Sequence, residues 1–299
     1  MSGYRSFAVA GTGNVGKFII DALLEKKAIG VISSITVLTR SSEGKNELES
    51  KGVKVVAVDY TFPSSLEAAL SGIDIVIAAL GLHGIEHQVA LAASAKTAGV
   101  KLFVPSEYGS DPHGQTDHPL FKLKEVAKQK LKELGLPYVV FFAGLFADQA
   151  LAQGFSVALG FDFVNGVLSI PGTGNPALSW ATRADTAKFI VHTLTTLPQS
   201  KLEWQTFRIE TDRISFNDLA AIWNERQAKA GKPTATITHR PRSQFEEALK
   251  KTPNDILPMF WLLLEDGQLV VGRPEGISNF DIPGWSPKRV SDVLQDLYR

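Results

Sequence analysis

The chain has 299 residues, 44% of them hydrophobic, so it can bury a full core as one large domain or as two unequal ones. Its 31 basic and 31 acidic residues cancel, which gives no overall positive field to attract nucleic acid or an anionic membrane. The absence of cysteine excludes disulfides and thiolate catalysis, and fits a reducing compartment. No apolar run approaches the roughly 18 residues of a membrane span, and the amino terminus leads straight into a predicted strand without room for a signal peptide. We therefore expect a cytoplasmic globular protein that acts on a small molecule.

The first predicted strand, Phe7–Ala10, runs into three glycines and then into a helix. Gly11, Gly13 and Gly16 fit G-x-G-x-x-G. In this motif the first glycine permits a tight turn, the second lets a pyrophosphate approach the backbone, and the third allows close packing of helix and strand. An ordinary strand-to-helix turn is the alternative. The expected phosphate contacts come from Gly11, Thr12, Gly13, Asn14, Val15 and Gly16.

Strands and helices alternate through the first half of the chain. Such alternation predicts an α/β fold with a doubly wound parallel sheet that is covered on both faces. The predicted strands are Phe7–Ala10, Ile35–Leu38, Val53–Val58, Ile73–Ala78, Lys101–Val104 and Tyr138–Phe142, and the predicted helices are 14–27, 42–51, 63–70, 84–98 and 119–134.

Ligands of doubly wound sheets bind beyond the carboxyl ends of the strands. The second strand ends at Arg40, about 20 residues past the glycines, where an arginine suits a cofactor 2′-phosphate and an acidic residue suits NAD. Lys45 is a second cation nearby, and the small residues Ala79, Leu80 and Gly81 at the fourth strand would let a dinucleotide cross the sheet edge. These residues favour NADPH, with a solvated surface arginine as the alternative at position 40.

Two further strand ends leave alternatives open. Asp59 and Tyr60 after the third strand either face the adenine or cap the next loop. His83 and His87 have the i,i+4 spacing of metal ligands, but no third ligand completes a coordination shell, so no metal site is expected.

The fifth strand leads into Ser106, Glu107 and Tyr108 and then into a lysine-rich helix. Lys124 and Lys130 lie on the two edges of the apolar stripe of this helix, so periodicity does not choose between them. Lys124 is closer to the strand ends along the helix axis. A solvated helix face is the alternative for each lysine.

The sequence resembles the NmrA-like and isoflavone reductase-like branch of the atypical short-chain dehydrogenases. The resemblance rests on Ala10–Gly16, Leu38–Arg40, Val104–Gly109, Phe121–Lys124 and Gly135–Tyr138, and on the later segments Gly172–Pro176 and Thr182–Ala187. It implies a Rossmann fold, NADPH as cofactor, and one catalytic lysine, corresponding to Lys124, in place of a tyrosine-lysine pair. Ser106, Glu107 and Lys124 would then also contact the cofactor. Ala10 departs from the usual first glycine, and Tyr108 stands where plant members often have phenylalanine.

The chemistry implied for Lys124 is proton exchange with a phenol or enol while NADPH delivers hydride to a conjugated double bond or a benzylic carbon. The competing hypothesis is a non-catalytic NmrA-like sensor of NADP(H) that acts through a protein partner. A homodimer is compatible with both the reductase and the sensor hypothesis.

The remainder of the chain is expected to provide the substrate site. Residues 1–150 are assigned to the NADP-binding domain, to which the chain returns around 176–213, and residues 151–299 mainly to a smaller α/β region. A helix at 216–230 is predicted to begin with a cap formed by Ser215 and Asp218. The candidate substrate contacts are Tyr108, His118, Phe146, Phe155, Met259 and Phe260. Core packing is the alternative for each large apolar side chain, and solvent exposure is the alternative for His118.

Overall fold

The computed structural model describes all residues except 1, 42, 45, 112–117 and 279–281. The chain passes more than once between two compact units. Unit 1 comprises Met1–Tyr108, Thr116–Phe141 and Thr186–Phe207, and unit 2 comprises Gly109–Gln115, Phe142–Asp185 and Arg208–Arg299.

Unit 1 is built on a five-stranded parallel sheet with the strand order β3-β2-β1-β4-β5. The inner strands are almost entirely buried, as expected for a parallel sheet with helices on both faces. The predicted α/β class and parallel sheet are therefore confirmed. The strands are β1 (Ser6–Ala10), β2 (Ser34–Thr39), β3 (Lys54–Ala57), β4 (Ile75–Ala78) and β5 (Leu102–Val104).

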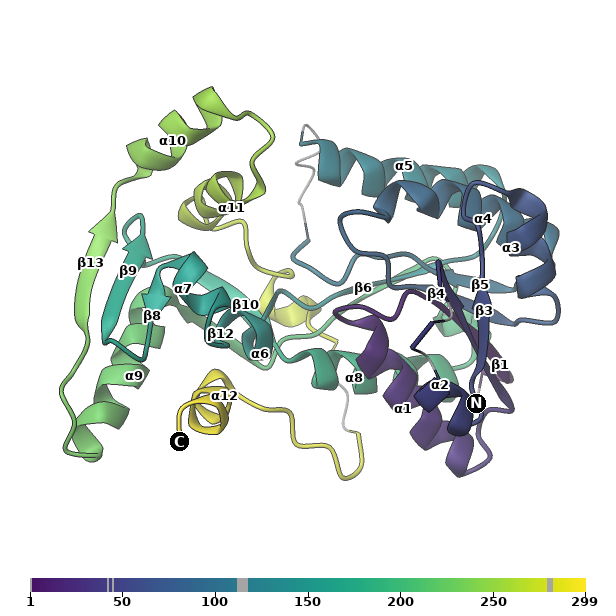
Figure 1. Cartoon of the computed structure of the whole chain (residues 1–299), viewed down its shortest axis with the longest axis horizontal. Helices are drawn as coiled ribbons and strands as arrows, with labels where there is room; N and C mark the ends of the chain where they lie inside the picture. The colour runs from purple at the N-terminus through teal and green to yellow at the C-terminus, as the bar shows by residue number, and fades with distance from the viewer. Residues whose placement is uncertain (1, 42, 45, 112–117, 279–281) are drawn as a thin grey trace. The chain divides into compact units, whose positions relative to one another are not determined.

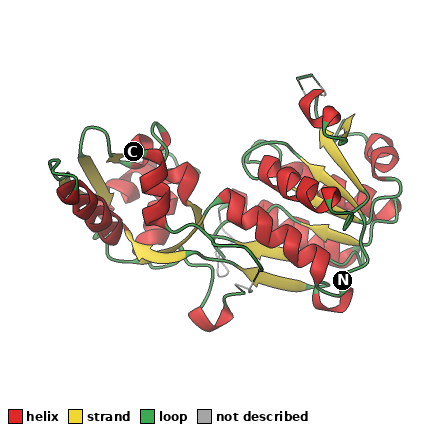
Figure 2. Cartoon of the chain, turned by 90° about the horizontal axis from the view of Figure 1, so that it is seen from below, coloured by secondary structure: helices red, strands yellow, loops and turns green. Residues whose placement is uncertain are grey.

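Helices cover both faces of this sheet (Figures 1 and 2). Helices α3 (Pro63–Leu70), α4 (Gln88–Thr97) and α5 (Pro119–Glu133) share one apolar core with the strands. Helices α1 (Gly16–Ala28) and α8 (Arg183–Thr196) lie against the other face (Figure 1). The short helix α2 (Asn46–Ser50) precedes β3, and the turn η1 (Ile85–His87) precedes α4. Two covered faces leave the strand ends as the places where backbone is accessible.

The sixth predicted strand continues unit 1 beyond β5. Strand β6 (Val139–Phe142) pairs with β11 (Gln205–Arg208), and a single parallel bridge joins Tyr138 to Phe103 of β5. The turn η2 (Gln199–Lys201) follows α8.

Unit 2 has two three-stranded sheets, β12-β10-β7 and β13-β9-β8, around an aromatic core that includes Trp180, Phe216 and Trp261. The predicted cap of α9 is confirmed, because Ser215 Oγ accepts from the Asp218 amide at 3.0 Å and an Asp218 carboxylate oxygen accepts from the Ser215 amide at 2.9 Å. None of the helices in the described part of the chain is long and apolar enough to cross a membrane. The elements are β7 (Leu145–Phe146), α6 (Ala147–Ala150), α7 (Phe155–Leu159), β8 (Phe161–Asp162), β9 (Val167–Pro171), β10 (Ala177–Ala181), β12 (Asp212–Ser215), α9 (Phe216–Lys229), β13 (Thr236–Arg240), α10 (Arg242–Lys251), α11 (Ile256–Glu265), η3 (Pro274–Gly276) and α12 (Val290–Leu297).

Candidate functional site

The three glycines after β1 have different structural requirements. Gly11 has φ of 106°, and a Cβ there would lie 2.6 Å from the Ala79 carbonyl oxygen. A Cβ at Gly16, the first residue of α1, would lie 2.2 Å from the Gly11 carbonyl oxygen. At Gly13 a Cβ would meet no protein atom within 4 Å. The fold thus excludes side chains at Gly11 and Gly16. At Gly13 the fold leaves room for a side chain, so a glycine is needed there only if a ligand approaches the backbone.

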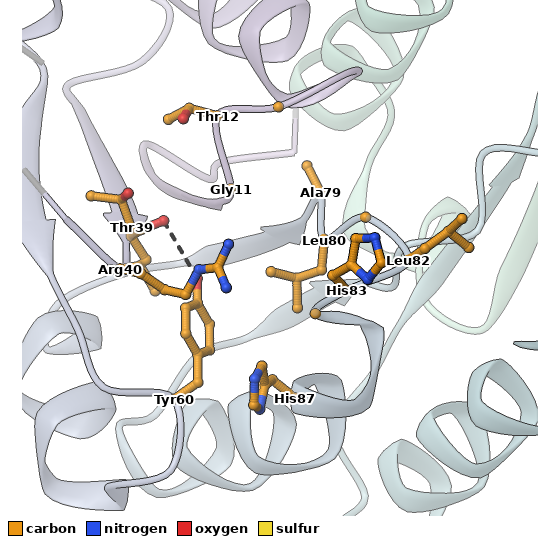
Figure 3. A pocket seen from close by; sticks show the side chains of 14 residues that line it. Gly11, Thr12, Thr39, Arg40, Tyr60, Ala79, Leu80, Leu82, His83 and His87 are labelled. Carbon is orange, nitrogen blue, oxygen red and sulfur yellow. Dashed lines mark hydrogen bonds between the residues drawn. The ribbon is translucent and has the colours of Figure 1, made fainter. Parts of the chain in front are cut away.

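A cavity of about 370 Å³ opens beside this loop, at the carboxyl ends of β1, β2 and β4 (Figure 3). Seven predicted cofactor contacts line it: Gly11, Thr12, Gly13, Arg40, Ala79, Leu80 and Gly81. Its other lining residues are Leu38, Thr39, Tyr60, Leu82, His83, Gly84 and His87. Asn14, Val15 and Gly16 continue the loop into α1 without lining the cavity. Lys45 lies outside the described residues.

One wall of the cavity combines Arg40 with two rings. The Arg40 side chain is exposed and lies beside Tyr60 (Figure 3). The Tyr60 hydroxyl donates to the Leu38 carbonyl at 3.4 Å, and burial raises its pKa to about 12 although Arg40 opposes the shift. The His87 ring stacks on Tyr60 with a centroid distance of 5.5 Å. The wall therefore offers a cation next to a flat, uncharged phenol.

Seven lining residues were not among the predicted site residues: Leu38, Thr39, Tyr60, Leu82, His83, Gly84 and His87. Of these, Tyr60 was an alternative for the adenine side. It follows the end of β3, and His83 and His87 follow the end of β4, so position after a strand was the available signal. Asp59 does not face the cavity; its carboxylate accepts from the Thr61 amide at 2.8 Å and the Thr61 hydroxyl at 2.6 Å. No group of three or more histidine, cysteine or acidic side chains in the described residues is placed to bind a metal ion.

The segment after β5 is tied to the cavity wall. The Ser106 hydroxyl donates to the Leu80 carbonyl and the Tyr108 hydroxyl to the Ala78 carbonyl, both at 2.8 Å. Tyr108 is buried, and burial raises its pKa far above the ordinary value. The hydroxyl that was considered as a substrate contact therefore has a backbone partner in the structure.

Helix α5 brings Lys124 to this segment. Lys124 Nζ donates to the Glu107 carbonyl at 2.8 Å and lies 3.2 Å from Glu107 Oε2. Lys130, the other candidate from periodicity, faces away and lies 3.5 Å from Glu133. These contacts distinguish two lysines that periodicity left equal, and they agree with the axial position that favoured Lys124. Ser106, Glu107 and Lys124 do not line the cavity itself.

His118 is the cap of α5. Its Nδ1 accepts from the Leu120 amide at 3.2 Å, and the ring lies edge-on to Phe121. The ring is partly buried, in contrast to the alternative of a histidine in water.

The apolar candidates all belong to unit 2. Phe146 in β7 and Met259 and Phe260 in α11 are partly exposed, and Phe155 in α7 is exposed. Phe260 packs against Trp261 of the unit 2 core.

Comparisons of the sequence and of the structure with known proteins find relatives in the same group of enzymes. The chain is 27% identical over 259 residues to eugenol synthase 2 of Clarkia breweri, which covers 82% of this chain and 80% of that protein. It is 27% identical over 258 residues to phenylcoumaran benzylic ether reductase 1 of Arabidopsis thaliana, with the same coverage of 82% and 80%. The structure of leucoanthocyanidin reductase with NADPH from Vitis vinifera superposes with a TM-score of 0.77 at 22% identity, covering 97% of this chain and 98% of that one. The NmrA-like family model matches residues 7–265, and the chain therefore belongs to the NmrA-like family.

Proposed function

We propose that this protein is an NADPH-dependent reductase that transfers hydride to a small aromatic or phenolic substrate, at an activated carbon–carbon double bond or a benzylic carbon. The observation that carries the proposal is the position of the Lys124 ammonium. It is held at the end of β5, next to a segment bonded to Leu80 of the glycine-lined cavity. The named activities of the relatives support this reaction class.

The cavity residues fit the phosphate and purine groups of NADPH. The space at Gly13 accommodates a pyrophosphate against the backbone, with the amides at the start of α1 as donors. Arg40 is exposed and placed to pair with a 2′-phosphate, and Tyr60 offers a flat surface beside it. When bound, NADPH supplies the hydride.

Lys124 performs the proton chemistry in this proposal. Its ammonium donates a hydrogen bond to a ribose or substrate hydroxyl and gives a proton to the substrate oxygen on which negative charge develops. Solvent restores that proton after the product leaves. We keep Phe146, Met259 and Phe260 as candidate substrate contacts, because their side chains are partly exposed.

The test is NADPH oxidation by the purified protein with phenolic enones, quinones, isoflavonoids and benzylic-ether lignans. Lys124→Ala is expected to retain NADPH binding and to lower kcat by about 100-fold or more, the usual contribution of a general acid. Lys130→Ala is the matched control from the same helix and should retain full turnover. Tight NADPH binding without turnover by the unmodified protein would instead favour the sensor of NADP(H).

A further inference from the structure

Glu107 is a buried acid enclosed by two lysines. Its side chain is 1% exposed, with Lys124 Nζ 3.2 Å from Oε2 and Lys128 Nζ 3.5 Å from Oε1. Neither carboxylate oxygen has a hydrogen-bond partner among the described residues. An isolated buried carboxylate is strongly unfavourable, so an ammonium group beside it is needed to compensate its charge, and here two lie within 3.5 Å.

The backbone around Glu107 is fixed on both sides. The Ser106 amide donates to Gln88 Oε1 at 2.7 Å, and the Tyr108 hydroxyl donates to the Ala78 carbonyl. Tyr108 has φ of 34°, a left-handed conformation that is rare for a bulky residue and is found preferentially at functional sites. Glu107 therefore presents its carbonyl and its carboxylate together to Lys124.

The two lysines have different surroundings. Lys124 is 13% exposed and, among the described residues, pairs with one acidic side chain, that of Glu107, whereas Lys128 also lies 3.1 Å from Glu125 at the surface. Burial would lower the pKa of Lys128, but Glu107 and Glu125 outweigh it and the pKa is raised. The charged and titratable groups around Glu107 are thus Lys124, Lys128 and the protonated phenol of Tyr108, with Glu125 beyond Lys128.

We propose that Glu107 is the positioning residue of the reaction: it fixes the Lys124 ammonium at the site and compensates its charge, while Lys128 competes for the same carboxylate. The proposal rests on the proposed function of Lys124. It makes an opposite prediction for each partner. Removal of the Glu107 charge leaves the Lys124 ammonium less stabilised, whereas removal of the Lys128 charge leaves Lys124 as the sole counter-ion of the carboxylate.

The first test measures the proton on Lys124 without turnover. Trace acetylation with acetic anhydride between pH 6 and pH 11, read by mass spectrometry, reports the fraction of Lys124 present as free amine. In Glu107→Gln the pH of half-maximal labelling should fall by about one unit, the usual minimum effect of a close opposite charge. In Lys128→Gln it should rise by about half a unit. Glu125→Gln is the matched control, because Glu125 is exposed and contacts Lys128 but not Lys124.

The second test is kinetic. Glu107→Gln should lower kcat about tenfold at neutral pH, because the ammonium is no longer held in position. It should also move the alkaline limb of the kcat profile to lower pH, while the Kd for NADPH changes less than twofold. Lys128→Gln should move that limb to higher pH. Shifts in the same direction for both variants, or unchanged labelling in Glu107→Gln, would overturn the positioning role. If labelling shifts as expected but no substrate is turned over, the positioning role of Glu107 stands and the reductase assignment fails. If Lys124→Ala abolishes turnover but labelling is unchanged in Glu107→Gln, the reductase assignment stands and the positioning role fails.

Discussion

Two strands of the same parallel sheet end in opposite ways. The end of β1 is open, and Gly11 and Gly13 line the cavity there. The end of β5 is filled by the buried side chain of Glu107, with Lys124 and Lys128 around it. A ligand can reach the backbone only where side chains are missing, whereas a charge is held in place by burial among opposite charges. Under the proposed function the two ends serve different purposes, binding at β1 and positioning at β5, and substitutions should separate them.

At the β1 end, Gly16→Ala should damage the fold itself. The new Cβ would overlap the Gly11 carbonyl oxygen at 2.2 Å, and neither backbone segment can move without shifting α1 against β1. We expect the free energy of unfolding to fall by about 3 kcal/mol or more. Urea unfolding measures this loss, and Gly13→Ala, with space for its Cβ, is the matched control. Equal losses in the two variants would show that the loop is tighter than described.

Gly13→Val should affect the ligand and spare the fold. A Cβ at this position meets no protein atom within 4 Å, so the unfolding free energy without ligand should change little. NADPH affinity should fall about 100-fold, or about 2.7 kcal/mol. Calorimetric titration with NADPH checks this, and retained affinity would place the pyrophosphate elsewhere.

Arg40→Ala should distinguish between the two nicotinamide cofactors. Loss of a charge-assisted contact is expected to weaken NADPH binding about 20-fold, close to 2 kcal/mol, and to change NADH binding about twofold or less. The NADPH affinity of Arg40→Lys should lie between those of the unmodified protein and Arg40→Ala, because lysine keeps the charge but loses the planar guanidinium. Fluorescence titration with both cofactors provides the comparison. Equal losses for NADPH and NADH would remove the 2′-phosphate assignment.

A carboxylate at the opposite edge of the sheet should contribute to stability alone. Asp74 accepts from the Arg5 and Ser6 amides at 2.8 and 3.0 Å and from Lys101 Nζ at 2.7 Å. Burial acts to raise its pKa, but Lys101 and the two amides outweigh it and the pKa is lowered. The stabilisation is therefore present above about pH 4, the ordinary value of an aspartate, and is lost as the pH falls through the lowered pKa.

Asp74→Asn should accordingly lower the free energy of unfolding by about 1 kcal/mol at pH 7 and by less at pH 3. Chemical denaturation at the two pH values measures the difference, and NADPH affinity should not change. A cost that is independent of pH would mean that Asp74 acts through its shape and not its charge.

The alternation of strands and helices, the glycine turn and the cap of α9 follow from the sequence, because each depends on residues close together in the chain. Gly16 is required by the Gly11 carbonyl oxygen, which the turn brings within 2.2 Å of its Cβ position. Gly11 is favoured locally by its φ of 106°, but the carbonyl oxygen 2.6 Å from its Cβ position belongs to Ala79, after β4. The position of Arg40 also follows from local order, since it comes directly after a buried strand.

Which side chains contact one another depends on the packing of the elements. Periodicity left Lys124 and Lys130 equal, and the packing of α5 beside the end of β5 separated them by bringing Lys124 to Glu107. The stacking of Tyr60 on His87 joins residues that follow two different strands. Phe161 and Phe163 are buried in the core of unit 2 while Phe155 is exposed, although all three are phenylalanines of one short segment. Local sequence sets the backbone of each element, but burial and charge pairing depend on neighbours that are distant along the chain.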